Sequence, residues 1–199
     1  MIYPQIEDQA RAMTAATPLL RSLHDDLRAS FARYWGEDYS DAARAEHSAR
    51  TTANIVYDHA ETLLRHREDE IPGLKLLKKC GLTLAMYQDK AVVRFKKVNP
   101  EGYHANYPTD QQLDFDEQFS FSEFPDEAFR LVAGYQPDPT GTYIERVMIV
   151  RQIGDTVYWC AQVNILDEDA IWEDATPPRL FNLDLTGWRP PVRRRGRGG

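Results

Sequence analysis

The fold is decided by the stretch Gly141-Thr142-Tyr143-Ile144-Glu145-Arg146-Val147-Met148-Ile149-Val150-Arg151-Gln152-Ile153-Gly154-Asp155-Thr156-Val157-Tyr158-Trp159-Cys160-Ala161-Gln162-Val163. Two runs rich in β-branched and aromatic residues flank Gly154-Asp155, which predicts a β-hairpin. Alternation along the second run predicts one apolar face, made of Val157, Trp159, Ala161 and Val163. This face needs an apolar cover, which we expect the rest of the chain to supply.

Two amphipathic segments upstream are suited to that cover. Apolar residues recur at helical spacing from Thr17-Pro18 to a stop at Gly36, and again from Ser40-Asp41 to Pro72-Gly73. Thr17 and Ser40 are suitable N-caps, and proline is favoured in the first turn. A short link between two such helices predicts an antiparallel helical hairpin.

A second β-hairpin is predicted in the middle of the chain. Leu82–Tyr87 and Ala91–Lys96 are strand-like runs separated by Gln88-Asp89-Lys90. Short helical pieces are expected at Leu74–Lys79, at Pro125–Val132 and around Ile171-Trp172. Together, the two helices and the two β-hairpins predict an α+β fold, in which the helical hairpin packs on an antiparallel sheet of at least four strands.

Length and composition predict three regions. Residues 1–73 are the helical hairpin, 74–176 the sheet domain, and 177–199 a tail rich in proline and arginine that we expect to be disordered from about 189. Hydrophobic residues make up 42% of the 199, enough to bury a core. We expect no membrane span and no signal peptide. The two cysteines lack metal-type spacing, so a cytoplasmic protein with reduced thiols is predicted.

Charge is distributed unevenly. Five arginines between 189 and 197 contribute +5 to a net charge of −7, so the remaining chain carries −12. An acidic body argues against broad binding of a phosphate backbone. The tail is the exception, with Arg193, Arg194 and Arg195 able to contact nucleic acid, an acidic partner or the acidic body itself.

Catalytic candidates are few. Clustered carboxylates can hold Mg²⁺ for phosphodiester chemistry, which singles out Asp114 and Asp116 together with Glu145 and His104. The carboxylate-X-lysine element of many metal-dependent nucleases is absent, so a solvated acidic loop is the favoured explanation of the cluster. No histidine or cysteine spacing predicts a metal site, and no phosphate loop or cofactor motif is found.

A nucleic-acid platform is a further possibility. The basic strand residues Arg94 and Lys96 lie near Tyr103 and Tyr107 in the sequence, and aromatic rings stack on bases while cations hold phosphates. Charged residues on an outer sheet face also serve simply to keep that face soluble.

Two segments resemble small bacterial and phage proteins encoded in toxin–antitoxin-like or prophage gene neighbourhoods. They are Val92–Lys97 continuing through Asn106–Gln112, and Ala133–Gln136 continuing through Thr140–Val147. The resemblance covers the middle third to half of the chain and implies no catalytic residue. It implies an accessory, immunity or regulatory role. Because the sequence has no coherent catalytic set, an acidic body and two sheet edges that need covering, we expect a protein-interaction module that binds a protein partner through the helical hairpin or the open sheet face. A metal-dependent nuclease and a single-stranded nucleic-acid-binding protein are the alternatives.

Overall fold

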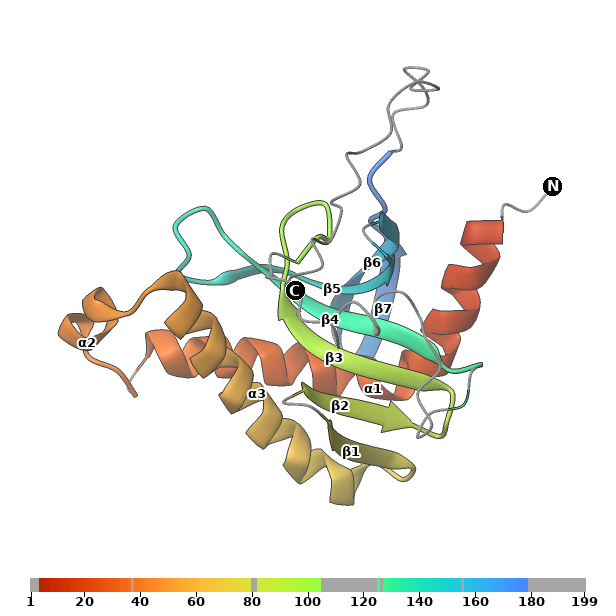
Figure 1. Ribbon diagram of the computed structural model, residues 1–199, viewed down its shortest axis with the longest axis horizontal. Helices are drawn as coiled ribbons and strands as arrows, with labels where there is room; N and C mark the ends of the chain where they lie inside the picture. The colour runs from red at the N-terminus through yellow and green to blue at the C-terminus, as the bar shows by residue number, and fades with distance from the viewer. Residues whose placement is uncertain are drawn as a thin grey trace, which may run out of the picture.

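Three helices and seven strands are found in residues 4–36, 38–79, 82–104, 125, 127–154 and 156–178, the part of the chain that the computed structural model describes (Figure 1). In chain order they are α1 (Pro4–Trp35), α2 (Asp41–Glu46), α3 (Ala49–Glu70), β1 (Leu74–Lys79), β2 (Leu82–Tyr87), β3 (Ala91–Lys97), β4 (Phe129–Pro137), β5 (Ile144–Ile153), β6 (Thr156–Leu166) and β7 (Asp169–Asp174). Helices come first and a mostly antiparallel sheet follows, so the predicted α+β fold is confirmed.

Helix α1 is longer than predicted. It begins at Pro4 rather than Thr17 and continues through Pro18, which lies on its exposed side. The extra turns are held by the sheet, since the Gln9 side-chain amide donates to the carbonyl oxygen of Cys160 (2.8 Å). The prediction was wrong because an internal proline weakens an isolated helix, whereas here packing on both sides of it sustains the helix.

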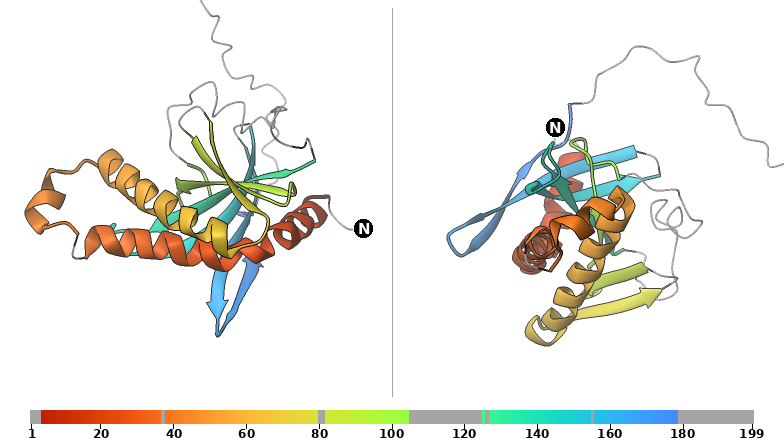
Figure 2. Two further views of the ribbon diagram at one scale, coloured as in Figure 1. Left: turned by 90° about the horizontal axis from the view of Figure 1, so that it is seen from below. Right: turned by 90° about the vertical axis from the view of Figure 1, so that its left-hand side faces the viewer.

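The second predicted helix is divided in two. Helix α2 ends before His47, and Ser48 caps α3 by accepting a hydrogen bond from the backbone N–H of Thr51 (3.1 Å). Helices α1 and α3 lie side by side as the predicted hairpin (Figure 2). Between them, the carboxylate of Asp26 accepts from the guanidinium of Arg67 (3.1 Å). No helix in the described ranges combines the length and apolar composition that crossing a bilayer requires.

The seven strands form one sheet in sequence order from β1 to β7. Both predicted hairpins are present, as β2–β3 and β5–β6. Every neighbouring pair is antiparallel except β3 and β4, which run parallel. The sheet is therefore two meanders, β1–β3 and β4–β7, joined side by side at a parallel pair.

Three segments predicted as helical are strands or contain one. Leu74–Lys79 is β1, the second half of Pro125–Val132 belongs to β4, and Ile171-Trp172 lies within β7. The short segments at β1 and β7 are too brief to sustain a helix on their own, because the first turn is costly to nucleate. Each finds a complete hydrogen-bonded ladder beside an existing strand instead.

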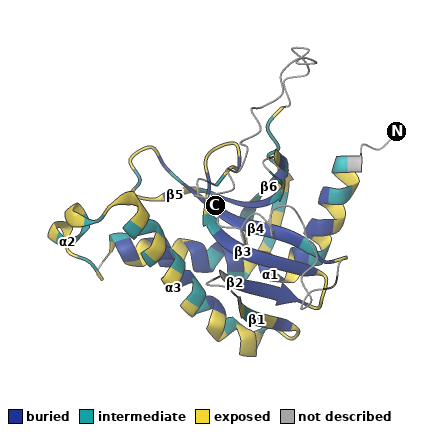
Figure 3. Cartoon of the chain, in the orientation of Figure 1, coloured by how far each residue is buried: buried dark blue, intermediate teal, exposed yellow. Residues whose placement is uncertain are grey.

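The helices cover one face of the sheet, and the main core lies between the two layers (Figure 3). Trp159 is fully buried there, and its indole N–H donates to the carboxylate of Asp8 on α1 (2.7 Å). The alternating apolar residues along β6 are the predicted floor of this core, with one exception. The register shifts between Arg151 and Gln152 of β5, so Val157 faces away from the helices.

The outer face, the side of the sheet away from the helices, is buried over its centre as well. Its apolar cluster consists of Val98, Val132, Met148, Val150, Val157 and Cys160. Burial raises the pKa of the Cys160 thiol to about 12, and the nearby charge of Asp174 adds to the effect. The predicted reduced, packed thiol is therefore what the structure shows for Cys160.

Candidate functional site

The described residues that the sequence singled out for binding lie on or beside the outer face. Along β3, alternate side chains point to opposite sides, so Phe95 enters the main core while Arg94 and Lys96 belong to the outer face. Tyr103 and His104 follow β3 after one turn. The predicted residues Tyr107, Arg193, Arg194 and Arg195 lie outside the described residues.

Two arginines are buried at the centre of this face. Arg94 on β3 is 2% exposed and Arg130 on β4 is 3% exposed. The parallel register pairs Val92 with Arg130 and Arg94 with Val132, so the two arginines are diagonal neighbours. Burying a guanidinium is costly without polar partners, and both arginines take part in further interactions. Arg94 is thus part of the packed interior rather than an exposed phosphate contact.

A rigid turn brings His104 to Arg94. The Asn99 side-chain oxygen accepts from the backbone N–H groups of Glu101 (3.1 Å) and Tyr103 (2.8 Å). Gly102 has φ +86° and lies so close to β6 that a Cβ there would be 2.3 Å from the Cys160 sulfur. After this turn, the His104 Nε2 lies 2.9 Å from an Nη of Arg94.

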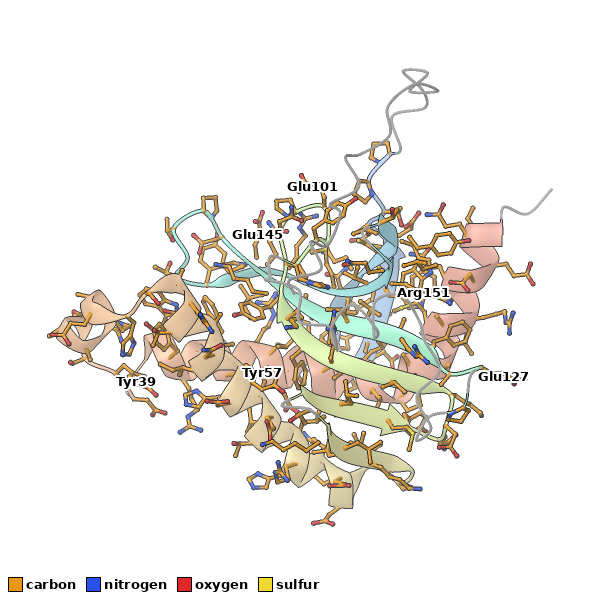
Figure 4. All side chains as sticks on the ribbon, in the orientation of Figure 1. Tyr39, Tyr57, Glu101, Glu127, Glu145 and Arg151 are labelled. Carbon is orange, nitrogen blue, oxygen red and sulfur yellow. The ribbon has the colours of Figure 1, made fainter. Side chains whose placement is uncertain are left out.

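Glu145 has a different partner from His104. It is the extra residue of a bulge opposite Gln136 and Pro137, on β5 (Figure 4). Its carboxylate accepts a hydrogen bond from the Gln136 amide (2.8 Å), whereas His104 engages Arg94. The remaining nuclease candidates, Asp114 and Asp116, lie outside the described residues.

Metal chemistry gains no support from the part of the chain that the structure describes. No group of three or more histidine, cysteine, aspartate or glutamate side chains is placed there to hold a metal ion. The nuclease alternative therefore has no assembled site in the described ranges.

No family model matches this chain, and neither a curated protein nor a solved structure matches it. Residue roles cannot be carried over from a relative.

A surface that the sequence interpretation missed is the hairpin formed by β6 and β7. It extends past α1 at one end of the sheet (Figure 2). Leu166 is 61% exposed and Ile171 is 45% exposed, and the register places them as diagonal neighbours on the outer face. Trp172 points the other way and packs against the main core. The available signal was weak: a short apolar run, Ala170-Ile171-Trp172, includes two residue types that favour strands and lies between acidic residues.

The hairpin is strongly acidic. Five of the eight residues from 167 to 174 are carboxylates and none is basic: Asp167, Glu168, Asp169, Glu173 and Asp174. Burial alone would raise the pKa of Asp174, but hydrogen bonds from Thr176 and Gln9 outweigh it and lower that pKa. The tip is held to α1 by the guanidinium of Arg21, which donates to the carbonyl oxygen of Glu168.

The two edges of the sheet differ in what covers them. At β1, the backbone N–H of Leu76 donates to the carboxylate of Glu68 on α3 (3.0 Å), so a side chain occupies that edge. At β7, only β6 pairs with the strand within the described residues. An open strand edge offers backbone donors and acceptors to an incoming extended segment. The β6–β7 hairpin is therefore the candidate functional site.

Proposed function

We propose that this chain is a protein-interaction module that binds a basic, extended segment of a partner protein along β7. The observation that carries the proposal is the exposure of Leu166 and Ile171 beside the edge of β7, which pairs only with β6 among the described strands. The helical hairpin is a less suitable contact surface, since the apolar stripes of α1 and α3 are buried against each other and the sheet.

Strand addition would use three kinds of contact. Backbone hydrogen bonds along β7 would supply affinity, and apolar partner residues would cover Leu166 and Ile171. Lysine or arginine side chains opposite Asp169 and Glu173 would supply charge complementarity, because opposite charges across a strand pair attract. The same charges disfavour pairing of two β7 strands, since a two-fold arrangement centred on Ile171 would set Asp169 against Glu173.

The resemblance noted above favours one source for the partner. In a toxin–antitoxin-like gene pair, the partner would be the product of the neighbouring gene. A basic partner is consistent with a protein that itself binds nucleic acid.

The test is a pull-down from lysate of the native host, with and without nuclease treatment. The bait is the wild-type chain or the double variant Asp169→Lys/Glu173→Lys. The matched control is Glu46→Lys/Asp69→Lys, which changes the net charge equally at exposed helical positions. We expect one protein to be retained at about equal molar amounts by the wild type and the control, to survive nuclease, and to be lost with the hairpin variant.

Equal retention by the hairpin variant would overturn the site. Recovery of nucleic acid, or of nothing once nucleic acid is digested, would overturn the protein-partner proposal and favour one of the nucleic-acid alternatives.

A further inference from the structure

A cleft of about 500 Å³ lies where α1 passes the β2–β3 turn and the start of β4. This volume is in the range of small-molecule sites. Its walls come from elements far apart in sequence. The residues that line it include Arg11, Thr14, Pro18, Tyr87, Lys90 and Phe129. The cleft shares no residue with the β6–β7 hairpin.

The floor of the cleft is apolar and aromatic. Tyr87 is buried at the end of β2, and Phe129 is half-buried at the start of β4. On the helix side, Pro18 and two alanines are too short to fill the space. The chain leaves β2 through a tight turn in which Gln88 and Asp89 have φ of 48° and 56°, which keeps the turn compact.

Cations surround this floor. The guanidinium carbon of Arg11 lies 5.8 Å from the centre of the Phe129 ring, and that of Arg151 lies 5.3 Å from it. Arg151 is neutralised, because it pairs with the carboxylate of Asp8. Arg11 and Lys90 are different: neither forms an ion pair with a carboxylate of the described residues.

The acidic residues nearest in sequence do not neutralise Arg11 or Lys90. Asp89 lies next to Lys90 in the turn, and Glu127 lies two residues before Phe129. Both are exposed, and neither pairs with Arg11 or Lys90. On a chain of net charge −7, two cations without carboxylate partners at one apolar cleft form a local basic site.

We propose that this cleft binds a small organic anion that carries one phosphate or carboxylate group on a flat apolar body. The charged group would lie between Arg11 and Lys90, where a guanidinium offers paired donors and an ammonium adds a second charge. The flat body would cover Tyr87 and Phe129. Arg11 is already oriented by its contact with the Phe129 ring, so less side-chain freedom is lost when the anion binds.

The test is calorimetric titration of the full chain at low ionic strength with four probes. They are a nucleoside monophosphate, the matching uncharged nucleoside, an aromatic monocarboxylate and inorganic phosphate. We expect at least one of the two aromatic anions to bind about tenfold or more tightly than both the nucleoside and inorganic phosphate, because charge and apolar contact both contribute. Which of the two binds identifies the head group.

Two variants assign the site. Arg11→Gln and Lys90→Gln should each weaken binding of the preferred anion about tenfold, the usual scale for losing a charge-assisted hydrogen bond. The matched controls Arg50→Gln and Lys75→Gln remove exposed cations elsewhere and should leave the Kd unchanged. All four positions are exposed, and circular dichroism checks that each variant is folded.

Failure of both aromatic anions to bind more tightly than the nucleoside overturns the proposal. Equal weakening by the control variants also overturns it, since that result shows general charge attraction and no defined site.

Discussion

Asp26 shows how a single buried charge depends on its partner. Its side chain is 2% exposed, and it accepts hydrogen bonds from Arg67, whose side chain is 35% exposed. Burial raises the pKa of Asp26 above its ordinary value, although Arg67 opposes the rise. Hydrogen bonds to Glu70 and Asp26 raise the pKa of Arg67 in turn. The pair is therefore asymmetric, because only the carboxylate is fully removed from water.

Removing the two partners should have unequal effects. Arg67→Met should lower the free energy of unfolding by about 3 kcal/mol, because it leaves a buried carboxylate without its cation. Asp26→Asn should cost much less, since Arg67 still reaches solvent and Glu70. Urea unfolding at pH 7 measures both changes, and equal losses would contradict the asymmetry.

Asp26 also predicts a dependence on pH. Its pKa in the folded state lies above the ordinary value of 3.8, so its favourable contribution is complete below pH 3.8 and is lost as the pH rises through the raised pKa. The Asp26→Asn variant lacks this loss. As the pH rises above 3.8, the free energy of unfolding of the variant should therefore increase relative to that of the wild type. A difference between the two proteins that stays constant with pH would contradict the prediction.

The sequence could not have identified this pair. Asp26 lies in a predicted helix among ordinary surface charges, and Arg67 follows 41 residues later. Their meeting depends on how α1 and α3 are rotated against each other. Likewise, the sequence predicted Arg94 as a binding residue from its charge, and only the register of β3 and β4 shows that it is buried.

At the scale of elements, the first turns of α1 depend on Asp8. Its carboxylate accepts from the indole of Trp159 and from Arg151, which ties the helix to β6 and β5. Asp8→Ala should lower the free energy of unfolding by about 2 kcal/mol, because the buried indole N–H loses its acceptor. Asp8→Asn should cost less, since its amide oxygen can still accept one bond.

The matched control is Glu7→Ala, which removes an exposed neighbouring carboxylate on the same turn. Hydrogen exchange along α1 provides a second measurement. Faster exchange confined to the turns before Pro18 is expected for Asp8→Ala alone, and an effect of equal size from Glu7→Ala would show that helix charge is the cause.

The elements that the sequence predicted correctly are those with strong local patterns. The β2–β3 and β5–β6 hairpins have turn residues between strand-like runs, and the helical hairpin has long apolar stripes. The elements missed at β1, β4 and β7 are defined by the neighbours they pair with. The candidate site at β7 was missed for the same reason.

At the scale of the whole molecule, Cys160 reports on global unfolding. It is fully buried, and burial raises the pKa of its thiol to about 12. In a Cys80→Ser background, reaction with a thiol reagent at pH 8 should require unfolding. For a domain of ordinary stability the rate should be roughly a thousandfold or more below that of the unfolded chain. Labelling of the native protein at a rate close to the unfolded one would contradict this.

The contact between α1 and the last strands has a consequence for biosynthesis. The ribosome makes α1 first, yet this helix packs against β6 and β7, which are made more than a hundred residues later. Because a nascent chain grows by roughly 5–20 residues per second, the part of α1 that packs on β6 and β7 stays uncovered for roughly 6 to 25 seconds. During that interval the emerging chain presents an amphipathic helix of the kind that chaperones bind, and full burial of α1 waits until β6 and β7 have been made.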